Sequence, residues 1–535
     1  MLLLPLLLSL APQAPTVGLG GLGKIDFPNS GAPAAQADFL RGALLLHSFE
    51  YDDSAEAFRA AEAADPGFAL AFWGEAMTHA HPIWQEEDVG AAREALARLA
   101  PTPAARAEKA PTERERGLLA AAEILFGEGE RAPRWKAYAH AMGELHGRFP
   151  QDDELAAFHA VALLGSATNG RDIPTYMRAA AIAEEILVRN PDHPGALHYA
   201  IHSYDDPVHA PLGLRMARHY GVVAAAAEHA LHMPSHIYVA LGLWRDSVAS
   251  NVASIAAGDA RRARKGLGLD GRAYHSLYWL CYSELQLGHV AEARRRLEEM
   301  RRDVAAGPSK RTRTHLVLMR AAYVTATDDW AGELARFEVD LAGLERAPTA
   351  AEAFVRAYGA LRRGEAPGAA GDTLAALVRE RDPKKPAAPA PADCCSPAAQ
   401  AAYSPSERAL SVMEAELRAV LGADAAVVRR ELEAAAAAED AMGFDFGPPT
   451  VVKPAHELLG EWLLAAGEPA AARTHFEAAL RRAPGRARAW LGLARAARAA
   501  GDAELARATY ADLAQQWSEA DADLAALAEV RAGAR

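Results

Sequence analysis

Four histidines carry a spacing that can chelate metal ions. His198 and His202 lie in the motif HYAIH, and His232 and His236 lie in HMPSH. Residues four positions apart on a helix have Cβ atoms about 5 to 6 Å apart, so each HxxxH pair can chelate one ion. The two pairs are 34 residues apart, and helices that pack about 8 to 10 Å apart could bring them to one ion or to an adjacent pair. Neutral imidazole suits zinc, copper, iron or nickel, so we expect a transition-metal cofactor.

Further residues near the two pairs are candidate ligands. The complete candidate metal set is His198, His202, His229, His232, His236, His275 and Asp205. Asp205 follows His202 by three residues, and its carboxylate could complete the coordination sphere or orient an imidazole. No glutamate follows His198, so the general base of HExxH proteases is missing. Whether such an ion would be catalytic or structural stays open, and so does enzymatic activity.

Two alternative interpretations of these histidines also stay open. The side chains could form hydrogen bonds between neighbouring helices, or, when protonated, they could bind an anionic peptide or a small carboxylate. An adjacent pair, Cys394 and Cys395, could bind a soft metal ion, but its Pro- and Ala-rich surroundings favour an exposed linker.

The composition predicts a helical protein with a large core. The 535 residues are 51% hydrophobic, 24% charged and 7% aromatic, and the abundant alanine favours helix over sheet. Asp and Glu number 70 against 57 Lys and Arg, a net charge of -13, which argues against nucleic acid as a partner. With three cysteines, a disulfide framework is excluded.

Apolar residues recur at the helical period along the chain, with Gly or Pro between successive stripes, which indicates paired helices. A period of 34 is clearest near the C-terminus, where the equivalent pairs are Ala472 and Ala506, Phe476 and Tyr510, and Ala479 and Leu513. These residues resemble the tetratricopeptide repeat (TPR), with its A-x3-F-x2-A pattern and closing proline. We therefore expect an all-α, TPR-like solenoid of about ten to twelve helical hairpins, wound as a right-handed superhelix.

Longer segments resemble a group of bacterial TPR-containing proteins. They are HSFEYDDSAEAFRAAEAADPGFALAFWGEAM, NPDHPGALHYAIHSYDDPVHAPLGLR, HALHMPSHIYVALGLWRDSV and KPAHELLGEWLLAAGEPAAA. In TPR proteins the second, fifth, ninth and thirteenth positions of a repeat face the concave groove, so the resemblance implies that both HxxxH pairs face it. The same count places His229, His275 and His315 at second positions and His47 and His81 at thirteenth positions.

Other residues are expected to line the same groove. They are Trp73, Met77, His81, Tyr278, Tyr282, Glu457 and Glu461. Ordinary core packing is the alternative for Trp73 and Met77, and a solvated helix face is the alternative for the two glutamates.

The chain divides into five expected segments. They are a signal peptide at 1–14, a linker at 15–34, a solenoid with the histidine cluster at 35–381, a Pro/Ala-rich linker at 382–404 and C-terminal repeats at 405–535. Leu2 to Leu10 form the apolar core of the signal, too short to span a bilayer, so we expect no transmembrane segment and a periplasmic or secreted location, or a cytoplasmic one without a signal.

The function expected is that of an exported TPR protein whose groove binds a transition-metal ion through its histidine cluster. The alternative is a non-enzymatic scaffold that binds a peptide or partner protein in the same groove.

Overall fold

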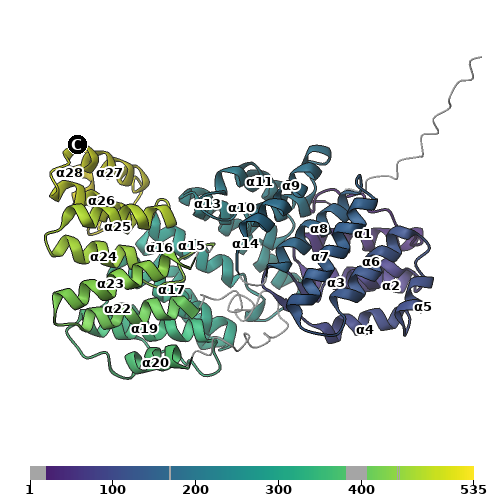
Figure 1. Cartoon of the computed structure of the whole chain (residues 1–535), viewed down its shortest axis with the longest axis horizontal. Coiled ribbons are helices and arrows are strands. Elements are labelled where there is room, and N and C mark those ends of the chain that lie inside the picture. Colours follow the sequence, from purple (N-terminus) through teal and green to yellow (C-terminus); the bar gives the residue numbers. More distant parts are fainter. Residues whose placement is uncertain (1–19, 168–169, 381–406, 443, 445) are drawn as a thin grey trace, which may run out of the picture.

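The computed structural model describes residues 20–167, 170–380, 407–442, 444 and 446–535. The described residues fold into helices that pack as successive antiparallel hairpins, apart from one two-stranded ladder of β1 (Ala80–His81) and β2 (Glu86–Glu87). Figure 1 shows α1 to α8 at one end of the molecule, α22 to α28 at the other and α9 to α17 between them. The expected all-α, TPR-like superhelix is confirmed.

The helices have the following bounds. The first half contains α1 (Gln36–His47), α2 (Tyr51–Ala64), α3 (Ala69–Met77), α4 (Val89–Leu99), α5 (Pro103–Glu108), α6 (Glu113–Leu125), α7 (Arg131–Arg148), α8 (Asp153–Ser166), α9 (Ile173–Arg189), α10 (Pro194–Tyr204), α11 (Ala210–Val223), α12 (Glu228–His232), α13 (Pro234–Ala240) and α14 (Trp244–Lys265). The second half contains α15 (Tyr274–Gln286), α16 (Val290–Ala306), α17 (Lys310–Thr327), α18 (Glu333–Arg336), α19 (Arg346–Arg362), α20 (Gly368–Arg379), α22 (Glu407–Leu421), α23 (Ala425–Asp440), α24 (Ala455–Ala465), α25 (Pro469–Arg482), α26 (Ala487–Ala499), α27 (Ala503–Gln516) and α28 (Leu527–Gly533). Two short 3-10 helices, Pro33–Ala35 and Leu269–Gly271, complete the set.

Small residues and aromatic rings join neighbouring hairpins as the repeat pattern predicts. A Cβ built on Gly74 of α3 would lie 2.3 Å from the ring of Phe58 in α2, and one on Gly492 of α26 would lie 2.2 Å from Phe476 in α25. Both phenylalanines are fully buried. A larger residue at either glycine would therefore push the hairpins apart, because close-packed interiors have no room for it.

The superhelix closes on itself in its first half. The turn after α1 contacts α10 and the helices that follow it: the Nδ1–H of His198 donates to the carbonyl of His47 at 2.8 Å. The hydroxyl of Tyr220 in α11 donates to Ser48 at 3.2 Å. Residues of the first and fifth hairpins therefore lie side by side, which a sequence pattern of local hairpins does not reveal.

A second closure joins the middle of the chain to its C-terminal repeats. The indole N–H of Trp244 donates to the carbonyl of Gly485 at 3.0 Å, and that of Trp517 donates to the carbonyl of Gln286 at 3.0 Å. The side-chain oxygen of Gln286 accepts from the amide of Ala487 at 3.0 Å. These contacts enclose part of the concave side, so the expected open groove becomes a cavity.

Two of the expected segment boundaries can be compared with the packing. In the described part of the 15–34 segment, Leu22, Ile25 and Phe27 are buried in the hydrophobic core that extends from Leu22 to Tyr238, which we call the first core. Residues 20–34 are therefore not a free linker. α22 packs on α19 and α20, which places the C-terminal repeats in the same stack as the preceding hairpins.

The expected signal at 1–14 and the 382–404 linker with its two cysteines lie outside the described residues. Among the described helices, none is long and apolar enough to cross a membrane.

Candidate metal centre

Six histidines gather in two sets of three where the two closures meet. The first set is His198 and His202 of α10 with His229 of α12, and the second is His232 and His236 of α12 and α13 with His275 of α15. Within each set, one ring nitrogen per residue lies within 4.8 Å of the others. We call these six residues, with Asp205, the histidine centre.

The repeat explains this arrangement. Each set combines an HxxxH pair with one histidine from the first helix of the next repeat, at the second position that the TPR register assigns to His229 and His275. The spacing of His232 and His236 predicted that they lie on one continuous helix. They do not, because α12 ends at His232 and α13 begins at Pro234. The pair still converges, with its Nε2 atoms 3.1 Å apart.

Hydrogen bonds at Nδ1 fix the tautomer of three of these rings. His198 donates to a backbone carbonyl, as described above. His232 Nδ1 lies 2.7 Å from Oδ1 of Asn251, and the Asn251 amide nitrogen donates to the carbonyl of Ser247 at 2.8 Å, which turns its oxygen toward the ring. His236 Nδ1 lies 2.5 Å from Oδ2 of Asp205. In each case an oxygen acceptor holds a proton at Nδ1.

The opposite nitrogens of these three rings lie close to other imidazole nitrogens of the centre. Nε2 of His232 lies 3.1 Å from Nε2 of His236, and Nε2 of His198 lies 3.2 Å from Nε2 of His229. Two nitrogens bound at about 2.0 to 2.1 Å to one tetrahedral ion would be separated by about 3.3 Å. The observed separations are thus close to those of ligands on a shared ion.

Burial keeps the imidazoles neutral. Desolvation, followed for most of them by the proximity of other imidazoles, lowers the pKa well below 6.5 for His198, His202, His229, His232 and His275. Nε2 of His202 and Nδ1 of His275 are buried and have no hydrogen-bond partner among the described residues. Neutral rings with open nitrogens suit a metal ion, and binding of an anion by protonated rings is disfavoured.

A second histidine group shows what satisfied imidazoles look like in the same protein. Nε2 of His47 lies 2.8 Å and Nε2 of His193 3.1 Å from the carboxylate of Glu154. The remaining nitrogens contact the hydroxyl of Tyr199 and the amide of Ala196. Burial favours the neutral carboxyl, but the two imidazoles bring the pKa of Glu154 to about 2. Here the interpretation of hydrogen bonding between helices applies, and no nitrogen is left for an ion.

Phe49 presses on the first histidine set from a strained turn. Its ring centroid lies 4.3 Å from that of His198 and 5.7 Å from that of His229. The backbone φ of Phe49 is +56°, a left-handed value that is costly for a bulky residue. The corresponding turns of later hairpins have glycine, as at Gly288 and Gly467 with φ of +75° and +82°. In the first hairpin this position therefore has a strained phenylalanine in place of glycine, and the phenylalanine ring packs against the histidines.

A cavity of about 150 Å³ opens beside the histidine centre. It is lined by His202, His229, His236 and His275, by Trp84, Tyr278, Trp279, Tyr282 and Phe446, by Leu318 and Thr325, and by Arg486. The indole of Trp279 stacks on His236, with ring centroids 4.4 Å apart. Tyr278 and Tyr282, expected in the groove, therefore lie in this cavity.

The other expected groove residues lie elsewhere. Trp73 and Met77 are buried in the first core, where Trp73 contacts Phe158 edge to face at 5.0 Å, so packing explains them. His81 lies in β1, its ring 4.2 Å from that of Tyr51.

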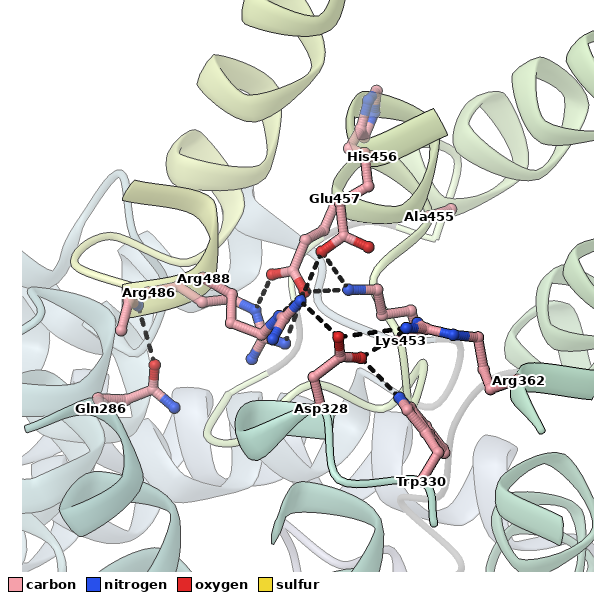
Figure 2. Close-up of polar contacts among 12 residues, drawn as sticks. Gln286, Asp328, Trp330, Arg362, Lys453, Ala455, His456, Glu457, Arg486 and Arg488 are labelled. Atoms are coloured by element: carbon pink, nitrogen blue, oxygen red, sulfur yellow. Dashed lines mark hydrogen bonds and ion pairs between the residues drawn. The ribbon is translucent and has the colours of Figure 1, made fainter. Parts of the chain in front are cut away.

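The two glutamates belong to a partly buried ion-pair cluster, and Figure 2 shows Glu457, Lys453, Arg486 and Arg488 of this cluster. Glu457 pairs with Arg486 at 2.6 Å, and Lys453 lies 2.7 Å from both Glu457 and Glu461. Arg488 pairs with Glu461 at 3.0 Å. A solvated face does not describe Glu457, since its side chain is fully buried.

Comparisons with known proteins support the repeat and little more. Residues 463–529 match the tetratricopeptide repeat family, so the chain is a TPR-containing protein. No curated protein matches the sequence. Solved structures with a similar chain course include the human IFIT1 dimer with m7Gppp-AAAA (11% identity, 95% of this chain and 90% of that chain covered, TM-score 0.33) and yeast Tom70 (11%, 94% and 95%, 0.27). At these values we take nothing about function from them.

Proposed function

We propose that this TPR-containing protein binds transition-metal ions in the histidine centre, one ion at each three-histidine set. The observation that carries the proposal is the close approach of two ring nitrogens. His232 and His236 each direct Nδ1 at an oxygen acceptor, and their Nε2 atoms lie 3.1 Å apart in a buried place. A metal ion would be held by both of these nitrogens.

The donor set indicates which ions fit. Imidazole nitrogens suit zinc, copper or iron, and the carboxylate of Asp205 behind His236 is the kind of outer partner that raises ligand basicity. Three protein ligands per ion leave a coordination position open, which is the arrangement of catalytic rather than structural zinc sites. Four of the six histidines also line the cavity, so a small molecule in the cavity would meet that open position.

The test is metal content and thermal stability of protein purified without a histidine tag. We expect up to two ions per chain and a melting temperature that falls on treatment with a chelator, because an ion that binds only the folded state stabilises it. Alanine at both His198 and His202 should remove the ion of the first set, and alanine at both His232 and His236 that of the second. A wild-type protein that contains no metal and takes up neither zinc nor copper tightly would refute the proposal.

The second candidate is a scaffold that binds a peptide or partner protein, and the match of residues 463–529 to the tetratricopeptide repeat favours it. A scaffold predicts that a chelator leaves the melting temperature unchanged. It also predicts that the variant with all four HxxxH histidines replaced folds normally and loses a partner. The same measurements therefore separate the two candidates.

A further inference from the structure

The cavity beside the histidine centre has a chemically mixed lining. Four imidazoles and Arg486 line it. Its other walls are mainly apolar and aromatic, formed by residues such as Trp279, Leu318 and Phe446. A volume of about 150 Å³ is that of cavities that accept a benzene-sized ring. The lining therefore fits a molecule with an apolar ring and at least one polar end.

Arg486 brings positive charge to this cavity. Its Nε and Nη2 donate to the two carboxylate oxygens of Glu457 at 2.6 and 3.4 Å, and its Nη1 donates to the hydroxyl of Tyr282 at 3.2 Å, although only 4% of the residue is exposed. A guanidinium has five N–H donors in a planar fork. Its contacts with Glu457 and Tyr282 leave donors of this fork for an oxygen ligand in the cavity.

The surrounding charges do not cancel. The cluster in Figure 2 contains the cations Arg362, Lys453, Arg486 and Arg488 and the carboxylates Asp328, Glu457 and Glu461. Each cation has a carboxylate partner, but four positive charges face three negative charges. This excess of positive charge favours an anionic ligand over a neutral one.

Two hydroxyls add directional donors to the cavity. Thr325 is 2% exposed, and its Oγ1 has no hydrogen-bond partner among the described residues. Burial raises the pKa of the Tyr278 hydroxyl, which therefore stays a protonated donor. An orphaned buried hydroxyl loses the hydrogen bonds it would make to water, so an acceptor in the cavity would restore them.

We propose that the cavity binds a small organic acid with an apolar ring, whose carboxylate pairs with Arg486 and whose ring lies between Trp279 and Leu318. The carboxylate would accept from the N–H groups of Arg486 that Glu457 and Tyr282 leave free, and such charge-assisted hydrogen bonds give both charge and orientation to this contact. In the metal-loaded protein the other end of the acid reaches the histidine centre. This last part rests on the proposed function, whereas recognition of the carboxylate by Arg486 does not.

The test compares two probes that differ only at the polar end, 3-phenylpropionate and 3-phenylpropan-1-ol, by isothermal titration calorimetry. We expect the acid to bind wild-type protein at least tenfold more tightly than the alcohol, in the chelated as well as the zinc-loaded form. Equal affinities for the two probes would overturn the inference. A preference for the acid that exists only with zinc bound would also overturn it, because the carboxylate would then be on the ion.

Two variants locate the headgroup. Arg486→Lys keeps the charge and the pairing with Glu457 but loses the planar fork, and we expect it to weaken binding of the acid at least threefold with the alcohol unchanged. Arg488→Lys is the matched control, since Arg488 belongs to the same ion-pair cluster but does not line the cavity. An acid affinity that is unchanged in Arg486→Lys, or reduced equally in both variants, would refute the assignment to Arg486.

Discussion

Nδ1 of His236 in α13 lies 2.5 Å from Oδ2 of Asp205, which directly follows α10 as its C-cap. This contact crosses from one repeat to the next and turns the opposite nitrogen of His236 toward His232. It also brings His202, Asp205 and His236 together as a third group of donors between the two histidine sets. Asp205 is thereby the residue that fixes the orientation of one set relative to the other.

Asp205→Asn should weaken metal binding about 10- to 100-fold, the usual effect of losing an outer carboxylate partner. The amide can offer its NH2 group to Nδ1, which would favour the tautomer with the proton on Nε2, the nitrogen needed for the ion. Competition of the loaded protein with a chromogenic chelator measures the affinity. Asp206→Asn is the control, because Asp206 is equally buried but pairs with Arg171 and His209. An Asp205→Asn protein with wild-type affinity would exclude this role.

His275→Gln should remove one ion and leave the other. His275 belongs only to the second set, and its ring centroid lies 4.5 Å from that of His232. His315 provides a matched control: it is a buried histidine of the following repeat whose Nδ1 donates to the carbonyl of Arg311 at 2.9 Å, outside both sets. Elemental analysis should show about half the wild-type metal for His275→Gln and full content for His315→Gln. Loss of both ions from His275→Gln would instead indicate one cooperative site.

The repeat register predicted the gathering of the six histidines, because a 34-residue offset places equivalent positions on one face of neighbouring hairpins. It could not predict that the superhelix closes, since contacts such as that between Trp517 and Gln286 join residues far apart in the sequence. The closure converts a groove into a cavity and adds Arg486 to it. The hydrogen bond of Asn251 to His232 could not be predicted either, because it depends on the side-chain geometry of α14.

Phe49 offers a test of the strained turn. At a φ of +56° glycine is more favourable than any residue with a Cβ, so Phe49→Gly should be more stable than Phe49→Ala by about 1 kcal/mol. Both should bind metal less tightly than wild type, because both lose the ring packed on His198. Chemical denaturation measures the stability difference. At Leu46, inside α1, the order should reverse, with alanine more stable than glycine. If alanine is more stable than glycine at Phe49 as well as at Leu46, the turn is not strained.

The chelated protein should lose stability as the pH falls from 7.5 to 5.5. Burial lowers the pKa of five imidazoles well below 6.5, those of His198, His202, His229, His232 and His275. In this window the unfolded chain therefore binds more protons than the folded one at these residues, and acid favours unfolding. Several buried carboxyls act in the opposite direction, because desolvation raises the pKa of Glu62 to about 8, that of Glu284 to about 7 and that of Glu416 well above its ordinary value.

A variant with glutamine at both His198 and His202 separates these contributions, since its carboxyls are unchanged. We expect the melting temperature of chelated wild-type protein to fall more steeply between pH 7.5 and 5.5 than that of the variant. The difference between the two curves is the destabilisation that His198 and His202 contribute. His140→Gln, at an exposed position, should follow the wild-type curve. Parallel curves for wild type and the double variant would mean that the two rings are already protonated in the folded protein. Protonated rings repel cations, so that result would count against the metal centre as well as against the pH prediction.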